Sequence, residues 1–346
     1  MAIGGSNNTL TDNVISHNGF CGIILSGTNN TLTGNEISDN FRNFVIDGGS
    51  YEDFDHTIDT TNTVEGKPLY YVKNINDRVF DSSTNAGVFY AINCDNITIK
   101  DLTLAKNNEE GILFWNTHNS RIENVAVSEC LSGIQLNSSS NNTITDNNVS
   151  QNVGGIMLVE SSNITITNNT LIDNFYCGIY LGADVTKVYN NNFINNNIQV
   201  YCEGGSSNFF NLDKPLGGNY WSDWTGPDDD KDGFVDSPYV FVGGQDDLPW
   251  TVQDGWITPQ VRIEQLITKV LSLNLQQGIS NSLDSKLDAV KKALEDVNEN
   301  NDGAAINALG AFINAVNAQR GGKISEEDAD ALIEMAQQII DLLTNG

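Results

Sequence analysis

A short acidic stretch carries the clearest chemistry in this chain. The segment PDDDKDGFVDSPY contains, in order, Asp228, Asp230, Asp232, Gly233, Phe234 and Asp236. The four aspartates stand at the first, third, fifth and ninth positions of a calcium-binding loop, the glycine at the sixth, and the phenylalanine carbonyl at the seventh. Because Ca²⁺ prefers hard oxygens gathered around a glycine turn, the sequence predicts a calcium site here.

The same stretch departs from the usual calcium loop at one ligand. Tyr239 stands at the twelfth position, where such loops carry a bidentate glutamate, and no helical pattern flanks the segment. We therefore expect a weaker, extracellular type of calcium site, completed by Asp223, Asp246 or Asp247. The alternative is an acidic surface turn that holds no ion.

A second group of residues has the types that bind sugars, because aromatic rings and a few polar groups commonly line ligand sites. The candidates for ligand binding are Trp115, Tyr180, Tyr51, Asp55, His56 and Tyr70. Most of them lie in the segment from about residue 47 to 95, which interrupts the pattern of the surrounding chain. The alternative is that the aromatic side chains are buried beneath this insertion.

The acids of the chain also leave room for an enzyme. The acids and the base of a polysaccharide lyase or glycoside hydrolase would come from Asp53, Asp55, His56 and Asp59. Glu129 and Asp173 would lie two coils apart in one column, about 9.6 Å, near the upper limit for an inverting glycosidase. Any two outward acids in one column of a solenoid have this separation, so we favour a protein without catalytic activity.

These residues are positioned by a repeat. Asn8 and Asn18 recur as Asn30 and Asn40, each 22 residues later, and Gly111, Gly133 and Gly155 keep the same spacing. Periods of this length are typical of solenoids, in which each unit buries its apolar side against its neighbours. Inside a repeat, short runs such as Thr143-Ile144-Thr145 alternate as strands do, between turns rich in Asn, Gly, Ser and Asp.

Three short strands and three turns in 22 residues describe one coil of a parallel β-helix, with like residues in register around one narrow apolar shaft. An asparagine at a turn would then lie directly above the asparagine of the preceding coil. Asn152, Asn174 and Asn196 are expected to form such a hydrogen-bonded ladder.

We expect three regions. A β-helix occupies residues 1–205, with the irregular insertion at about 47–95. An acidic, tryptophan-rich cap with the calcium-type loop occupies residues 206–258, where Trp221, Trp224 and Trp250 would cover the last coil. Residues 259–346 carry apolar residues at helical spacing, as in NSLDSKLDAVKKALEDV, and predict a bundle of three or four helices.

Composition limits the classes of molecule that the protein can bind. The formal charge of −28 and the pI near 4.1 exclude a general nucleic-acid binder and favour cations as binding partners. No run of 18 or more apolar residues exists, so no membrane span is expected. The five cysteines lack CxxC spacing and are expected to be small buried residues. Because the chain begins inside a repeat, we expect the leader of an exported protein to be missing from it.

Two stretches carry a resemblance to known families. The repeats NNTITDNNVSQNVGGIMLVESSNITITNNTLIDN and the segment GNYWSDWTGPDDDKDGFVDSPY resemble NosD-type, CASH-domain parallel β-helix proteins of archaeal cell surfaces, which implies a right-handed β-helix. The tail AFINAVNAQRGGKISEEDADALIEMAQQIIDLL is similar to FIMAH/FIVAR-like helical modules of secreted proteins. The copper associated with the first family is not expected here, because His17, His56 and His118 are far apart in sequence and the cysteines lie on different coils.

These observations predict a secreted or cell-surface protein, mainly β, that binds an extracellular polysaccharide or cell-envelope polymer and is stabilised by Ca²⁺, without an organic cofactor. Two alternatives remain open. One is the polysaccharide lyase or glycoside hydrolase described above. The other is a filament or sheath subunit that self-associates through the ends of its coils.

Overall fold

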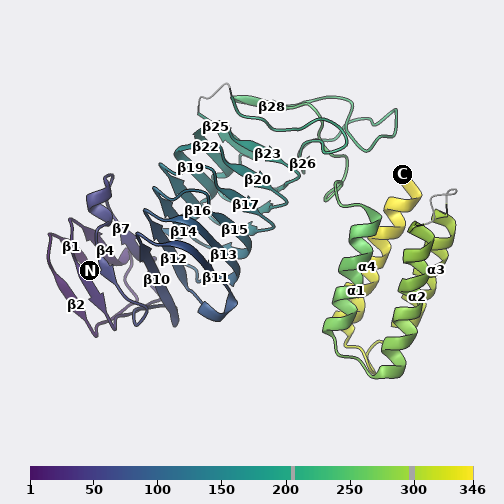
Figure 1. The fold of residues 1–346 in the computed structure, drawn as a ribbon, viewed down its shortest axis with the longest axis horizontal. Helices are drawn as coiled ribbons and strands as arrows, with labels where there is room; N and C mark the ends of the chain where they lie inside the picture. The colour runs from purple at the N-terminus through teal and green to yellow at the C-terminus, as the bar shows by residue number, and fades with distance from the viewer. Residues whose placement is uncertain (204–206, 296–300, 346) are drawn as a thin grey trace. The chain divides into compact units, whose positions relative to one another are not determined.

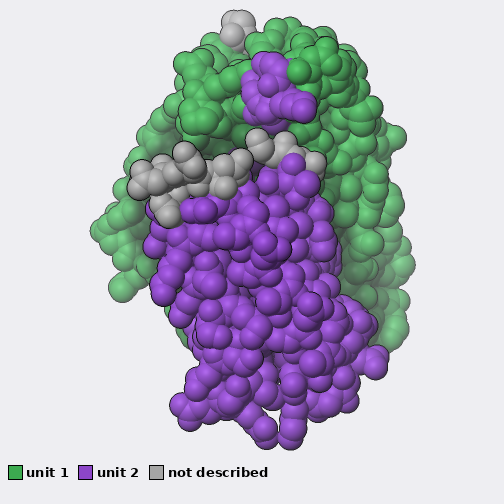
Figure 2. Space-filling model, turned by 90° about the vertical axis from the view of Figure 1, so that its right-hand side faces the viewer, with its two compact units in different colours: residues 1–229, 234–254 green, residues 230–233, 255–346 purple. Residues whose placement is uncertain are grey.

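Strands and helices separate along the chain into two compact units. The computed structural model describes residues 1–203, 207–295 and 301–345. Residues 1–229 and 234–254 form the first unit, and residues 230–233 and 255–346 form the second (Figure 2). The predicted fold class, a β-solenoid of about 22 residues per coil followed by helices, is confirmed. The limit expected at residue 205 lies outside the described residues.

The first coils form what we call the N-terminal stack (Figure 1). Its strands are β1 (Ala2–Gly4), β2 (Thr9–Thr11), β3 (Val14–Ser16), β4 (Cys21–Ser26), β5 (Thr31–Thr33), β6 (Glu36–Ser38), β7 (Arg42–Ile46), β8 (Thr57–Ile58) and β9 (Thr63–Val64). The coils pair in parallel with like residues in register, so that Leu10 lies beside Leu32 and Ile15 beside Ile37. A 3₁₀ helix, η1 (Tyr51–Phe54), lies between β7 and β8.

The remaining coils form the main stack. Its strands are β10 (Lys67–Lys73), β11 (Asn76–Phe80), β12 (Val88–Ile92), β13 (Asp95–Thr103), β14 (Glu110–Trp115), β15 (Arg121–Ser128), β16 (Ser132–Asn137), β17 (Thr143–Thr145), β18 (Asn148–Ser150), β19 (Gly154–Ser162), β20 (Thr165–Thr167), β21 (Thr170–Ile172), β22 (Cys177–Asp184), β23 (Lys187–Tyr189), β24 (Asn192–Ile194), β25 (Val200–Cys202) and β26 (Tyr220–Trp221), with a 3₁₀ helix η2 (Ser82–Thr84). Ile112, Ile134 and Ile156 superpose from coil to coil and are fully buried.

The chain reverses its direction between the two stacks. Val64 of β9 pairs with Lys67 of β10 in an antiparallel ladder. Glu65 and Gly66, which connect them, have φ angles of 49° and 75°. Positive φ at both central residues is typical of the two-residue turns that close β-hairpins. One sheet therefore runs from β25 to β10 and continues through β9, β6 and β3.

The N-terminal stack covers one face of the first strands of the main stack. Successive residues on a strand point to opposite faces. Phe89 points into the core of the main stack, whereas its neighbour Tyr90 is buried in the core of the N-terminal stack, with Phe44 at a ring distance of 5.5 Å. The solenoid is thus built of two stacks that meet at a buried joint, and not of the one shaft that the repeat indicated.

The asparagine ladder inside the main stack is as predicted. The main-chain N–H of Asn152 donates to Oδ1 of Asn174 at 3.0 Å, and Asn174 donates likewise to Asn196 at 3.1 Å. The Nδ2 of Asn174 also donates to the carbonyl of Val149 in the preceding coil. The ladder therefore satisfies buried main-chain groups at the turns, which would otherwise be costly to bury.

A cap follows the last coil, with a hairpin of β27 (Tyr239–Phe241) and β28 (Gly244–Asp246). The ring of Trp221 stacks on Phe193 at 4.3 Å and on Tyr239 at 4.3 Å. The carboxylate of Asp246 is buried beside it and accepts hydrogen bonds from Trp221 Nε1 and from the main chain of Asn219. The indole thus covers the apolar end of the last coil.

The second unit contains α1 (Pro259–Ser272), α2 (Gln277–Glu295), α3 (Asp302–Asn317) and α4 (Glu326–Asn345). Thr258 caps α1 by accepting a hydrogen bond from the N–H of Val261. Leu266, Leu287 and Leu309 are buried in a core shared by the four helices. Among the described residues, no helix has the length and apolar character needed to cross a membrane.

Candidate functional site

Exposed apolar side chains lie along one row of turns. Phe41, Val153 and Phe175 each follow directly after a buried asparagine of the repeat. Because neighbouring residues on an extended segment point to opposite sides, the side chain after the buried amide faces solvent. Phe41 is 64% exposed and Phe175 is 70% exposed. Exposed apolar groups gathered on one part of a surface indicate a binding site.

These side chains line a groove of about 870 Å³ where the two stacks meet. Both stacks contribute to its lining. The lining residues that matter below are His17, Asp39 and Phe41 from the N-terminal stack and Glu129, Gln151 and Phe175 from the main stack. The groove has the size of a small-molecule or oligosaccharide site, and it combines apolar and polar groups as such sites do.

The exposed charges of the groove are mainly acidic. The side chains of Asp39 and Glu129 are 61% and 50% exposed. The guanidinium of Arg42, which also lines the groove, lies 2.6 Å from the carboxylate of Glu109 and is neutralised by it. The Nζ atom of Lys106 lies 3.9 Å from Glu129, a loose contact in solvent that contributes little.

Two of the predicted ligand residues pack against other side chains. The ring of Trp115 stacks on Phe54 of η1 at 4.1 Å, so η1 lies over it. Tyr70 stacks on Phe89 at 5.5 Å and packs against the core of the main stack. Both aromatic side chains are thus partly buried, and their role in ligand binding stays a prediction.

A third predicted residue remains accessible. Tyr180 stacks on Tyr201 of the next coil at 5.8 Å, with nearly parallel rings. Its hydroxyl donates a hydrogen bond to Glu203. This hydrogen bond to the carboxylate raises the pKa of Tyr180 to about 12. Tyr176, which is 41% exposed, lies beside the pair, so this end of the sheet presents a small tyrosine cluster.

The acidic part of the insertion does not assemble an open site. Asp55 forms an ion pair with Lys73 at 2.5 Å. The imidazole of His56 is fully buried, and its Nδ1 accepts a hydrogen bond from the main chain of Asn30. Burial lowers the pKa of His56. His56 thus replaces an asparagine in the ladder. The side chain of Tyr51 lies outside the described residues.

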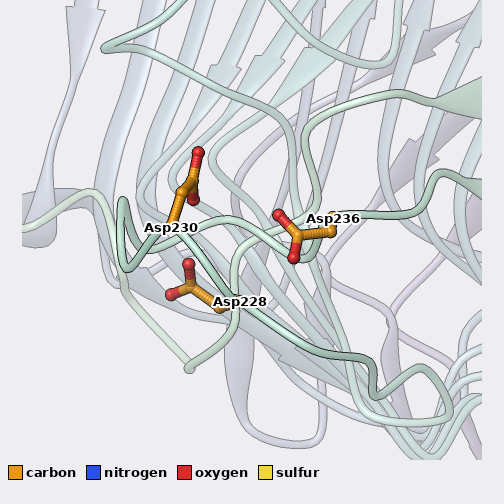
Figure 3. A group of neighbouring side chains, drawn as sticks. All are labelled: Asp228, Asp230 and Asp236. Atoms are coloured by element: carbon orange, nitrogen blue, oxygen red, sulfur yellow. The ribbon is translucent and has the colours of Figure 1, made fainter.

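The acidic loop brings three of its predicted ligands together (Figure 3). One carboxylate oxygen each of Asp228, Asp230 and Asp236 lie within 4.8 Å of one another. The loop is closed by a hydrogen bond from the N–H of Asp236 to the carbonyl of Pro227, and Asp236 also accepts one from the N–H of Asp229. Hard oxygens at this spacing suit Ca²⁺.

Asp232 lies outside the three carboxylates that converge. The ring of Phe234 is buried against Trp250 at 4.2 Å and holds the end of the loop on the cap, and its main-chain carbonyl stays a predicted ligand. Lys231 and Gly233, on either side of Asp232, have φ angles of 59° and 88°.

Comparison with known protein families gives two matches. Residues 55–226 match the family described as periplasmic copper-binding protein (NosD). Residues 263–341 match the FIMAH domain. No curated protein matches this chain.

Comparison with solved structures gives matches at low sequence identity and low TM-score. The bacteriophage CBA120 tailspike protein 2 is 13% identical over 62% of this chain, with a TM-score of 0.30, and the match spans 42% of the tailspike domain. DFA-IIIase from Arthrobacter chlorophenolicus A6 is 12% identical over 56% of each chain, with a TM-score of 0.26. The mannuronan C-5 epimerase AlgE6 A-module of Azotobacter vinelandii is 11% identical over 60% of this chain and 77% of its own, with a TM-score of 0.26.

The residues present do not fit a copper site. Among the described residues, the one group of three or more His, Cys, Asp or Glu side chains close enough to share an ion is the acidic loop. All five cysteines are buried free thiols, and burial raises the pKa of Cys130 and Cys177 to about 12, which disfavours the thiolate that binds metals. His118 bonds to Ser140 and Asn116. Through residues 55–226 the chain nevertheless belongs to the NosD family, and it carries a FIMAH domain at residues 263–341.

Proposed function

We propose that this protein is a non-catalytic extracellular or cell-surface protein that binds glycans or envelope polymers. The groove between the two stacks carries the proposal. It exposes Phe41 of the N-terminal stack and Phe175 of the main stack, and its lining also includes carboxylates and amides. Sugars present both apolar C–H faces and hydroxyl groups, so a site that combines rings with hydrogen-bonding side chains suits them.

The state of the acidic residues supports binding without cleavage. A general acid or base has to reach the proton that it transfers. Asp53 accepts hydrogen bonds from the main chain and the hydroxyl of Ser50, which lower its pKa. His56 is buried in the ladder. The imidazole of His56 is therefore not presented to a polymer at the surface, and the partly exposed carboxylate of Asp53 is already engaged by Ser50.

We also propose that the acidic loop binds Ca²⁺ and stabilises the cap. The convergence of Asp228, Asp230 and Asp236 supports this role, and so does the anchoring of the loop end through Phe234. An ion bound at this loop would hold together the two ends of a segment that otherwise repels itself.

The extracellular location is part of the proposal. The description of the NosD family as periplasmic supports a location outside the cytoplasm. The acidic composition of the chain also suits an extracellular location. Weak calcium sites are occupied only where the ion is abundant, as it is outside the cell.

A glycan array, probed with and without Ca²⁺, tests the function. The protein is expected to bind a subset of polysaccharides and to leave them intact. The eluted glycans are assayed for new reducing ends and unsaturated products. Release of either product from a bound polymer would replace this proposal with the lyase or hydrolase alternative, and failure to bind any glycan would remove it.

A further inference from the structure

We propose that the groove selects glycans that carry protonated amino groups, such as polymers of unacetylated amino sugars, over N-acetylated and uronic acid polymers. The proposal rests on the glycan-binding function proposed above and names its ligand class. Three features of the groove support it. They are the position of the two phenylalanine rings, the negative sign of the exposed charges, and the ion pair that holds the guanidinium of Arg42.

The rings provide the first feature. Phe41 lines the groove from the N-terminal stack and Phe175 from the main stack, and most of each residue is exposed. The face of an aromatic ring attracts cations within about 6 Å of its centre. Phe41 already has the guanidinium carbon of Arg42 at 5.8 Å from its ring centroid. An ammonium group on a sugar would make the same kind of contact with the exposed side of either ring.

The carboxylates provide the second feature. Asp39 of the N-terminal stack and Glu129 of the main stack both line the groove, with about half or more of each side chain exposed. A ligand chain that lies along the groove meets a carboxylate from each stack. An ammonium beside a carboxylate gains charge-assisted hydrogen bonds, whereas a uronic acid would meet like charge.

The cations of the groove provide the third feature. Arg42 could attract an acidic polymer, but Glu109 holds its guanidinium at 2.6 Å. His17 Nε2 lies 3.8 Å from the carboxylate of Asp39. Lys106 remains near Glu129 as a weakly held exposed cation. The formal charge of −28 adds a long-range attraction for a cationic polymer.

The test is calorimetric titration of the full chain with three oligosaccharides of equal length: a fully deacetylated glucosamine oligomer, its N-acetylated form, and an oligogalacturonate. We expect the deacetylated oligomer to bind at least about tenfold more tightly than the other two at a pH where its amines are protonated. Its affinity is expected to fall by about tenfold between about 50 and about 500 mM NaCl, because salt screens exposed charges.

Four variants connect this binding to the groove. Phe41→Ala and Phe175→Ala are each expected to weaken binding of the deacetylated oligomer by about tenfold, and Asp39→Asn and Glu129→Gln by about threefold to tenfold. Two matched controls lie outside the groove. Phe209→Ala removes another exposed ring, and Asp184→Asn removes another exposed carboxylate, and both should leave the affinity unchanged.

The outcomes separate this inference from the proposed function. Equal or tighter binding of the N-acetylated oligomer or the oligogalacturonate, weakened by Phe175→Ala, would overturn the amine preference and leave the glycan-binding groove standing. Binding of the deacetylated oligomer that responds equally to groove variants and controls would show a general charge effect and overturn the inference. If none of the three oligosaccharides binds, the amine preference is overturned, and the glycan array alone decides the proposed function.

Discussion

Glu110 lies in the joint between the two stacks and is a buried carboxyl group. Its side chain accepts a hydrogen bond from the hydroxyl of Tyr90, and the residue is 8% exposed. Burial raises its pKa to about 8, an effect opposed by the Tyr90 hydrogen bond and reinforced by the charge of Glu109. Glu110 is therefore protonated in the folded protein near neutral pH.

This burial predicts a pH dependence of stability. In the unfolded chain the carboxyl group titrates near 4.5, and in the folded protein near 8. Between these values only the folded state holds the proton, so Glu110 lowers the free energy of unfolding progressively as the pH rises. Glu110→Gln removes this titration. We expect its stability relative to the parent to rise from pH 5 to pH 8 by on the order of 1 kcal/mol per pH unit.

Chemical denaturation at a series of pH values measures this difference. Glu36→Gln, at an exposed position on β6, is the control and should show no such trend. A stability difference for Glu110→Gln that stays constant over this pH range would contradict the burial of an uncharged carboxyl group in the joint.

At the scale of the elements, the coils could be predicted from the sequence, because the side chains that stack on one another recur every 22 residues. Asn152, Asn174 and Asn196 form the ladder that their spacing indicated. His56 was harder to interpret. It takes a ladder position after an irregular stretch, where the period no longer identifies the residue that points inward.

The ladder predicts that alanine substitution destabilises the protein much more at a buried ladder asparagine than at an exposed asparagine of the neighbouring coil. Asn174→Ala removes the acceptor for Asn152 and the donor to Asn196, and leaves buried polar groups unsatisfied. We expect a loss of about 2–4 kcal/mol in the free energy of unfolding of the β-helix. Asn148→Ala, at an exposed position on β18, should cost less than about 0.5 kcal/mol. Urea unfolding of both variants provides the comparison, and equal losses would refute the ladder as a source of stability.

The acidic loop predicts which aspartates respond to calcium. If the carboxylate group in Figure 3 binds the ion, Ca²⁺ raises the melting temperature of the parent by a few degrees. This increase corresponds to about 1–3 kcal/mol of stabilisation by ion binding. Asp230→Asn is expected to abolish it. Asp232→Asn, in the same loop but outside the group, should keep most of it. Thermal scans with Ca²⁺, with Mg²⁺ and with chelator decide the point. If the increase in melting temperature survives Asp230→Asn but disappears with Asp232→Asn, the ion is not held by the three carboxylates that converge in the structure.

At the scale of the whole molecule, the repeat predicted that coils stack, but not where the stacking changes direction. The reversal depends on the two positive φ angles of Glu65 and Gly66, a local turn that any long-range period overlooks. The groove exists because the reversed N-terminal stack stands beside the main stack. Phe41 and Phe175 were visible in the sequence as aromatic residues after a ladder asparagine, but their meeting in one groove depends on the joint.

The separate cores of the two units predict two unfolding events. In the part of the chain that the structure describes, the buried core of the helical unit is formed by residues between Ile263 and Ile339. We expect Phe312→Ala, which empties a fully buried position of the helical core, to lower one calorimetric transition by about 3–5 kcal/mol and to leave the other in place. Asn174→Ala should act on the other transition. A single transition that both variants lower together would contradict independent cores.

The central claim is that the groove holds a glycan that the protein does not cleave. The most direct measurement is affinity electrophoresis of the parent and of the Phe41→Ala/Phe175→Ala double variant through gels containing the polysaccharide that the parent binds best on the array. The account predicts that the parent is retarded, that the double variant migrates as it does without polysaccharide, and that the polymer is recovered at its original length. Equal retardation of both proteins, or recovery of shortened polymer, would contradict it.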